Sequence, residues 1–177
     1  MAASKSNIAL IGMAGAGKST VGVLLAKASG KGFVDTDLLI QQRTGCSLQA
    51  IVDGRGYEAL REEEEQVLLS LDVTDHVIAT GGSVVYSAPG MAHLRRSSVV
   101  VFLDVSLETV RERIGDFSLR GLSKRPGQSL EELFRERHPL YCRYADVTID
   151  CDGLPHDAVC TRIMQLTISR IPGSESP

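Results

Sequence analysis

A glycine-rich octapeptide near the start of the chain constrains the fold more than any other feature. Gly12 to Ser19 reads GMAGAGKS and fits the pattern G-x-x-x-x-G-K-[ST] at every defined position. The octapeptide follows an apolar, strand-like run and opens a stretch whose apolar residues have helical spacing. A loop of this pattern between a strand and a helix binds the phosphates of a nucleotide. The sequence therefore predicts a nucleotide-binding protein.

Each residue type in this loop has a physical role. Its glycines let backbone N–H groups curl around phosphate oxygens at the start of a helix, where the helix dipole favours anions. We expect the Lys18 ammonium to reach the β- and γ-phosphates, and the Ser19 hydroxyl to be a ligand of Mg²⁺. The residues expected to bind ATP, with Mg²⁺ as the cofactor, are Gly12, Gly15, Ala16, Gly17, Lys18, Ser19 and Thr20.

Apolar runs alternate with amphipathic stretches along the whole chain, which is typical of an α/β fold with a central parallel β-sheet flanked by helices. Strands are predicted over residues 7–11, 32–35, 77–79, 99–103 and 147–149. Helices are predicted over residues 18–29, 38–43, 57–71 and 155–168, and after the N-capping residues Ser47, Ser106 and Ser129. We place a single domain at residues 1–169 and expect a disordered tail at residues 170–177.

Composition and charge exclude several classes of protein. The net charge of −3 lacks the basic excess of a nucleic-acid-binding protein. No apolar run approaches the ~20 residues that cross a bilayer, and the first residues lack a signal-peptide pattern. The four cysteines show no zinc-binding spacing, so we expect them to be reduced. We therefore expect a cytoplasmic protein that binds neither nucleic acid nor membrane. We also expect a monomer, although none of these features indicates the oligomeric state.

Residues 115–128 read GDFSLRGLSKRPGQ and show neither helical nor strand periodicity. A polar, basic segment inside a compact domain is usually a functional loop, and we expect a mobile lid here. A lid that closes over the phosphates excludes water and limits wasteful ATP hydrolysis. Arg120 and Arg125 both lie in this segment, and either could offset charge on the transferred phosphoryl group.

Two aspartates at strand ends compete for the role of a second metal-binding residue. Asp35 ends the predicted strand 32–35, and Asp104 follows the predicted strand 99–103. The pattern alone favours Asp104, because proteins with this loop often hold Mg²⁺ with an acid after an apolar strand. Asp104 could equally be a helix-entry residue beside Ser106. Spacing leaves both interpretations open.

Further motifs follow the phosphate-binding loop in order: FVDTDLLI at residues 33–40, TGCS at 44–47, an acidic helix, ATGG at 79–82 and RHPLY at 137–141. Together they resemble the shikimate kinase family, and the resemblance covers residues 7–168. It implies a P-loop kinase fold and the ATP-dependent phosphorylation of shikimate to shikimate 3-phosphate in aromatic amino-acid biosynthesis. The loop alone marks only a large superfamily, whereas the combined motifs are specific.

The resemblance implies roles for residues beyond the loop. Asp35 matches the family's acid near Mg²⁺, which favours it over Asp104. Asp37 matches the acid that binds the acceptor's hydroxyl groups and orients or deprotonates the attacking one, so the predicted catalytic residues are Lys18, Asp37 and Arg120. The other matches are Arg61 and Arg137 for the substrate carboxylate, Gly81 and Gly82 for close approach of the substrate, Arg113 for adenine and Arg120 for the lid.

Three positions depart from the family pattern. Ser83 stands where the family has a third glycine, and Leu60 replaces an aromatic residue. Gly121 replaces the proline of the lid's Arg-Pro pair, which predicts a more flexible lid. Because two of the changes fall in the expected acceptor site, a related hydroxy acid such as gluconate or homoserine is an alternative acceptor. A catalytically degenerate nucleotide-binding regulatory domain is a second alternative.

The lid arginine is ambiguous in the sequence. Arg125 and Pro126 restore the family's Arg-Pro pair, but Arg120 lies nearer the expected distance from Arg137. We therefore expect Arg120 to fill this role.

The acidic run Glu62 to Glu65 is most simply a solvated helix face, on which Glu64 is placed to brace Arg61. A GTP-dependent switch protein is a further alternative, because Asp53 to Gly56 matches D-x-x-G. The chain lacks the N-K-x-D element that recognises guanine, and a helix is expected at that position.

Overall fold

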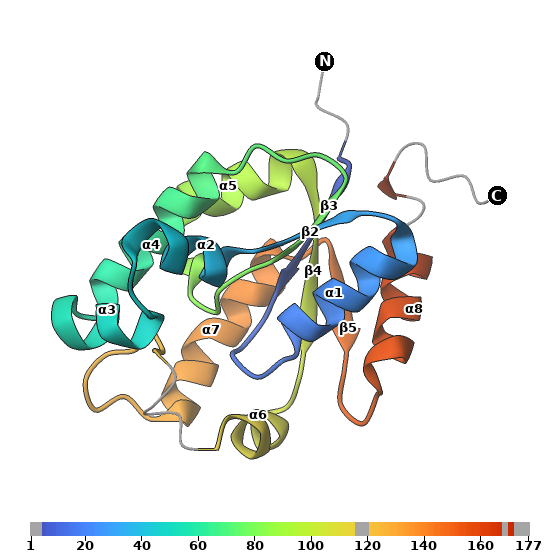
Figure 1. Ribbon diagram of the computed structural model, residues 1–177. Coiled ribbons are helices and arrows are strands. Elements are labelled where there is room, and N and C mark those ends of the chain that lie inside the picture. Colours follow the sequence, from blue (N-terminus) through green and yellow to red (C-terminus); the bar gives the residue numbers. More distant parts are fainter. Residues whose placement is uncertain (1–4, 116–120, 168–169, 172–177) are drawn as a thin grey trace.

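The computed structural model describes residues 5–115, 121–167 and 170–171, and a five-stranded parallel sheet lies at its centre (Figure 1). The strand order is β2-β3-β1-β4-β5, and every neighbouring pair is parallel. The strands are β1 (Asn7–Ile11), β2 (Gly32–Asp35), β3 (His76–Ala79), β4 (Ser98–Asp104) and β5 (Val147–Asp150). The predicted α/β fold with a parallel sheet flanked by helices is confirmed.

The central strands β1 and β4 are largely apolar because both faces of the sheet are covered. Every residue of β1 is buried, as are six of the seven residues of β4. Such runs are characteristic of parallel strands with helices on both sides. The register pairs Leu10 of β1 with Ala79 of β3 and with Val101 of β4.

Helices cover both faces of the sheet. In Figure 1, α1 and α8 pack together on one side, while α5 and α7 contact β4 on the other and α4 packs outside α5. The helices are α1 (Lys18–Ser29), α2 (Thr36–Thr44), α3 (Leu48–Arg55), α4 (Tyr57–Ser70), α5 (Ala88–Ser97), α6 (Leu107–Ile114), α7 (Leu130–Tyr144) and α8 (His156–Thr167). Within the described residues, no helix is long and apolar enough to span a membrane.

Periodicity in the sequence predicts no element over residues 83–98, where the structure has a short 3₁₀ helix, η1 (Val84–Tyr86), followed by α5. The local signals for α5 are nevertheless present. Ser87 caps the helix by accepting a hydrogen bond from the N–H of Gly90, and Pro89 lies in the first turn. The helix buries only Gly90, Met91 and Leu94, so its apolar periodicity is too short to stand out.

The carboxyl ends of the parallel strands meet at one edge of the sheet. The glycine-rich loop follows β1, Asp35 ends β2, Gly81 follows β3 and Asp104 ends β4. In open α/β sheets this edge is where ligands bind. The fold therefore gathers the motifs of the sequence, which are far apart in the chain, at one place.

The start of α7 has a complete capping box. Ser129 accepts from the N–H of Glu132 at 3.1 Å, and the Glu132 carboxylate accepts from the N–H of Ser129 at 2.8 Å. Ser129→Ala should lower the free energy of unfolding by about 1 kcal/mol, measured by urea denaturation. Thr161→Ala is the control, because the Thr161 hydroxyl bonds only a carbonyl within α8. Equal stability of the two variants would contradict the capping role.

Candidate active site

A cavity of about 790 Å³ opens at the carboxyl edge of the sheet. One group of lining residues comes from the loop, α1 and α6: Gly15, Gly17, Lys18, Ser19, Thr20 and Arg113. The other comes from α2, α4, the turn after β3, and α7: Asp37, Leu60, Glu64, Gly81, Gly82 and Arg137. The cavity thus brings together most of the residues predicted to bind nucleotide and most of those predicted to bind the acceptor.

The glycines of the loop have backbone conformations that other residues avoid. The φ angles are +147° at Gly12, +79° at Gly15 and +91° at Gly17. A Cβ atom at Gly12 would lie 2.7 Å from the carbonyl oxygen of Leu103, so the loop also needs glycine to pass β4. These conformations turn the chain from β1 into the amino end of α1, where backbone N–H groups can bind an anion.

Lys18 is buried beneath the loop. Its ammonium donates to the carbonyl oxygens of Gly12 and Met13 at 2.8 and 2.7 Å. Burial lowers the pKa of Lys18 to about 8, although the neighbouring carboxylate of Asp37 opposes the shift. A lysine in this state is largely protonated at neutral pH and lies beside the space where phosphates would bind.

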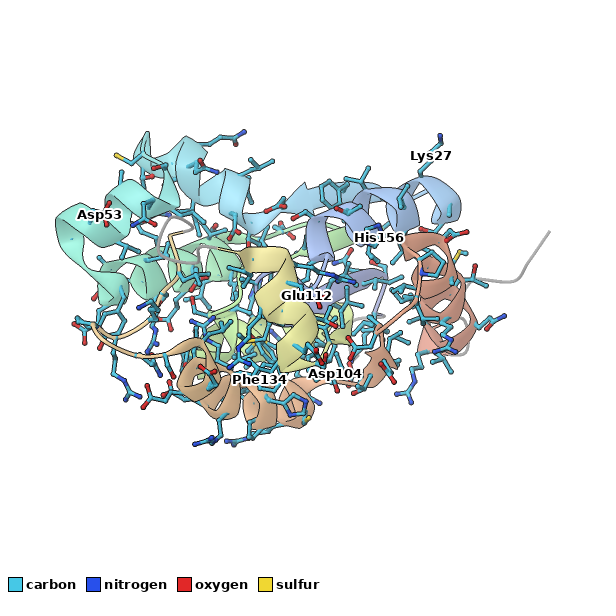
Figure 2. The ribbon with its side chains drawn as sticks, turned by 90° about the horizontal axis from the view of Figure 1, so that it is seen from below. Lys27, Asp53, Asp104, Glu112, Phe134 and His156 are labelled. Atoms are coloured by element: carbon cyan, nitrogen blue, oxygen red, sulfur yellow. The ribbon has the colours of Figure 1, made fainter. Side chains whose placement is uncertain are left out.

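The two candidate metal-binding acids lie in different surroundings. Asp35 Oδ2 accepts from the Ser19 hydroxyl at 2.6 Å, and its other oxygen caps α2 by accepting from the N–H of Asp37. Asp104 instead contacts Nε2 of His138 at 3.1 Å. In Figure 2, Asp104 lies near Phe134, whose ring stacks on His138. The structure therefore brings Asp35, and not Asp104, to Ser19.

Asp37 lies at the start of α2 and lines the cavity. Burial raises the pKa of Asp37 to about 6, and the nearby charge of Asp35 raises it further, against the opposing effect of Lys18. A Cβ atom on Gly81 would lie 2.9 Å from Oδ1 of Asp37 and would collide with Glu64. Only glycine therefore fits between these two carboxylates.

The two arginines expected to bind a carboxylate converge on Ser123. Arg137 lines the cavity, is 1% exposed, and donates from Nη2 to the carbonyl oxygen of Ser123 at 2.5 Å. Arg61 donates from Nε to the Ser123 hydroxyl at 2.9 Å. Among the described residues that line the cavity, Arg61 is not included. Arg61 therefore lies behind Ser123 in this structure.

The other three arginines with a predicted role differ in whether and where the structure places them relative to the cavity. Arg113 lines the cavity and donates to the carbonyl oxygen of Gly15 at 3.3 Å, beside the phosphate-binding loop. Arg120, the expected lid arginine, lies outside the described residues. Arg125 pairs with Glu136 at 2.7 Å.

The structure gives Gly121 a packing role. The residue has a φ of +52°, and a Cβ atom there would lie 2.5 Å from the backbone nitrogen of Gln49. The Gln49 side chain also accepts a hydrogen bond from the N–H of Gly121. Glycine at position 121 is thus required for close contact between the backbone there and α3. That Gly121 makes the lid more flexible stays a prediction.

Glu64 lies in the site, and its surroundings differ from both the solvated face and the contact with Arg61 that the sequence predicts. The carboxylate is 4% exposed and accepts a hydrogen bond from the Ser83 hydroxyl, so it is neither solvated nor the partner of Arg61. Burial raises the pKa of Glu64 to about 7, against the hydrogen bond from Ser83. The signal was available, because Glu64 is spaced four residues from Leu60 and from Leu68, both of which are buried.

A second missed group lies after β5. Leu154, Pro155 and His156 line the cavity beside the loop, and a Cβ atom on Gly17 would lie 3.4 Å from Nε2 of His156. His156 lies next to α1 in Figure 2. The sequence pattern indicates no role for the histidines. Residues 154–156 follow the last strand, at the same edge of the sheet as the loop, and this position is the signal that could have found the group.

Comparison with known proteins identifies the family. The family model described as shikimate kinase matches residues 14–167. The chain belongs to the shikimate kinase family. A shikimate kinase of Vibrio parahaemolyticus is 37% identical over 171 residues, which cover 95% of this chain and 99% of that protein. A shikimate kinase of Thiobacillus denitrificans is 40% identical over 149 residues, covering 82% of this chain and 81% of that one.

Solved structures support the same family assignment. A shikimate kinase from Acinetobacter baumannii, solved in complex with shikimate, superposes with a TM-score of 0.85 at 34% identity and covers 93% of this chain and 94% of its own. A deoxyadenosine kinase from M. mycoides, at 17% identity and a TM-score of 0.59, shares the fold alone. The resemblance read from the motifs is confirmed, and family membership makes this chain an ATP-dependent phosphotransferase of the shikimate pathway.

The burial of Glu64 makes stability depend on pH. Because burial raises its pKa from an ordinary 4.5 to about 7, the folded protein keeps a proton in this window that the unfolded chain releases. Stability conferred by this group is therefore lost as pH rises through the window. The free energy of unfolding of Glu64→Gln, relative to that of wild type, should therefore rise by about 3 kcal/mol between about pH 4.5 and pH 8.

Urea denaturation at both pH values measures this change. Glu62→Gln is the control, because Glu62 is exposed on the same helix. A pH-independent difference between Glu64→Gln and wild type would contradict the raised pKa.

Proposed function

We propose that this chain transfers the γ-phosphoryl group of ATP to the 3-hydroxyl of shikimate, giving shikimate 3-phosphate and ADP. One observation carries the proposal. A single cavity is lined by the phosphate-binding loop with Lys18, by the carboxylate of Asp37 and by the guanidinium of Arg137. A kinase that acts on a hydroxy acid needs groups of these three kinds within reach of both substrates.

The loop side of the cavity suits Mg²⁺ and the phosphates of ATP. The Ser19 hydroxyl and the Asp35 carboxylate are oxygen donors only 2.6 Å apart, and oxygen ligands are those that Mg²⁺ prefers. Mg²⁺, when bound with ATP, would offset negative charge on the phosphate oxygens. In our proposal, the Lys18 ammonium turns from the loop carbonyls to the phosphates, and Arg113 lies against the adenine ring.

The attacking hydroxyl needs a group that takes its proton. In our proposal, the hydroxyl oxygen forms a bond to the γ-phosphorus while the bond from that phosphorus to the ADP oxygen breaks, and the hydroxyl proton passes to Asp37. With a pKa raised to about 6, Asp37 is mostly ionised at neutral pH and is a stronger base than an ordinary aspartate. Gly81 supports this role, because its lack of a side chain leaves the Asp37 carboxylate open to the cavity.

Arg137 and Arg61 are proposed to bind the acceptor carboxylate, because a guanidinium forms two parallel hydrogen bonds with a carboxylate. For both arginines to do so, the carboxylate must replace Ser123 as their common partner. Gly82 adds room, since a Cβ atom there would lie 3.0 Å from Nη1 of Arg137.

The lid completes the proposed site. We propose that residues 115–128 close over ATP and that Arg120 contributes charge to the transferred phosphoryl group, with Arg125 kept at Glu136. We further propose a single catalytic domain that acts as a cytoplasmic monomer.

A different hydroxy acid is the alternative that a specific observation favours. Ser83 and Leu60, which depart from the family pattern, both line the acceptor part of the cavity. The switch-protein alternative has less support, because Asp53 and Gly54 lie within α3 and Asp53 accepts from the side chain of Gln49.

An acceptor screen tests the proposed function. ADP release, measured by a coupled assay, should rise well above the ATPase background with shikimate and not with gluconate or homoserine. Asp37→Asn should lower kcat by at least about a hundredfold while ATP binding is retained, because it removes the proposed base. Absence of shikimate-dependent ADP release would refute the proposal, and a better rate with another acid would change the acceptor only.

The metal assignment can be tested by a matched pair of variants. Asp35→Asn should raise the Mg²⁺ concentration needed for half-maximal activity by about tenfold, because it removes a charged oxygen donor beside Ser19. Asp104→Asn should leave this concentration unchanged, since Asp104 lies at His138. A larger effect of Asp104→Asn would return the role to the acid that the strand-end pattern favours.

A further inference from the structure

Tyr86 lies between the two arginines that are proposed to bind the acceptor carboxylate. It is the last residue of η1, which follows the glycine turn after β3. The Cζ atom of Arg61 lies 3.7 Å from the centroid of the Tyr86 ring, and that of Arg137 lies 5.4 Å from it. Nε of Arg137 also donates to the Tyr86 hydroxyl at 3.4 Å. One side chain therefore contacts both guanidinium groups.

The two arginines come from different elements, so another residue must hold their side chains in place relative to one another. Arg61 is carried by α4 and Arg137 by α7. A long arginine side chain has many rotamers, and fixing it for a bidentate contact costs conformational entropy. A cation held over the face of an aromatic ring is confined to a small region by the electrostatic attraction of the ring. Tyr86 supplies such a ring from a third element.

The Tyr86 ring is itself fixed through its hydroxyl. The hydroxyl donates to Oε1 of Glu136, on the same helix as Arg137. Oε2 of Glu136 accepts from Arg125 at 2.7 Å and from Gln128 at 3.0 Å. The phenol therefore connects η1 to α7 and to the segment before it.

We propose that Tyr86 is a positioning residue for the carboxylate-binding arginines: its ring holds the Arg61 guanidinium, and its hydroxyl is tied to Glu136 and to Arg137. The inference rests on the proposed function, since it assumes that these arginines bind the acceptor. Tyr86 does not line the described cavity and acts only through the arginines. Of the two rings that lie against Arg61, Tyr86 at 3.7 Å is nearer than Tyr57 at 5.0 Å.

KM values of two Tyr86 variants separate a role in positioning the arginines from a merely structural role. In the wild-type background, Tyr86→Leu removes ring and hydroxyl, and Tyr86→Phe removes the hydroxyl alone. Because a cation–ring contact at a partly buried site is lost, the KM for shikimate should rise about tenfold in Tyr86→Leu. Tyr86→Phe should keep it within about threefold of wild type, and the KM for ATP should stay within about twofold in both.

Two controls make the result specific. Tyr144→Leu removes another partly buried tyrosine that has an arginine over its ring, Arg143 at 5.7 Å, and should leave the KM for shikimate unchanged. The carboxamide of shikimate lacks the negative charge that the arginines recognise. With this analogue, Tyr86→Leu and wild type should have the same KM, because the interaction that Tyr86 supports is already absent.

Each outcome decides a separate point. An unchanged KM for shikimate in Tyr86→Leu, or an equal penalty with the carboxamide, would overturn the positioning role while leaving the proposed function intact. If Tyr86→Leu fails to fold, Tyr86→Met, which fills similar volume without a ring, gives the same test. Wild-type protein without turnover of shikimate would overturn the proposed function and, with it, this inference.

Discussion

The site depends on four ionisable side chains that are held together in a largely buried space. Lys18, Asp37, Glu64 and Arg137 line one cavity, and an unpaired charge in such a place is costly. Burial is the main cause of their shifts: it lowers the pKa of Lys18 to about 8 and raises the pKa values of Asp37 and Glu64 to about 6 and 7, while the attraction between Lys18 and Asp37 opposes the shift of each. The result is a proton acceptor and a cation whose charges change close to neutral pH, in a space that a charged substrate could enter.

The parallel sheet is what makes this cluster possible. Each of the four side chains is carried by a different helix, yet they meet because parallel strands end at the same edge. Glycines remove the steric obstacles to this meeting. Gly12 lets the loop pass β4, and Gly81 lets two carboxylates approach the same turn. The proposed phosphate-binding end is thus shaped by backbone conformation, whereas the proposed acceptor end is shaped by side chains from α2, α4 and α7.

These two ends differ in how closely they follow the family pattern. The loop and Asp35 match it completely, and the structure brings Ser19 and Asp35 into contact. The departures at Leu60 and Ser83 lie at the acceptor end, where Ser83 donates to Glu64 and Tyr86 lies against Arg61. These two departures from the family pattern therefore lie at the proposed acceptor end, while the residues proposed to bind ATP and Mg²⁺ match the pattern.

The sequence by itself determined the parallel α/β fold, the loop and its lysine, and the family, because each is encoded by residues that are adjacent in the chain or spaced at a regular period. It did not reveal α5, whose buried face is short, nor the role of Glu64, which lies within a run of charged residues. Strand-end spacing left Asp35 and Asp104 open, and the family resemblance favoured Asp35; the contact of Asp35 with Ser19, and the place of Tyr86 between Arg61 and Arg137, came only from the tertiary structure. These contacts join residues from separate elements, and the packing of helices on the sheet, which no local pattern records, decides which of them meet.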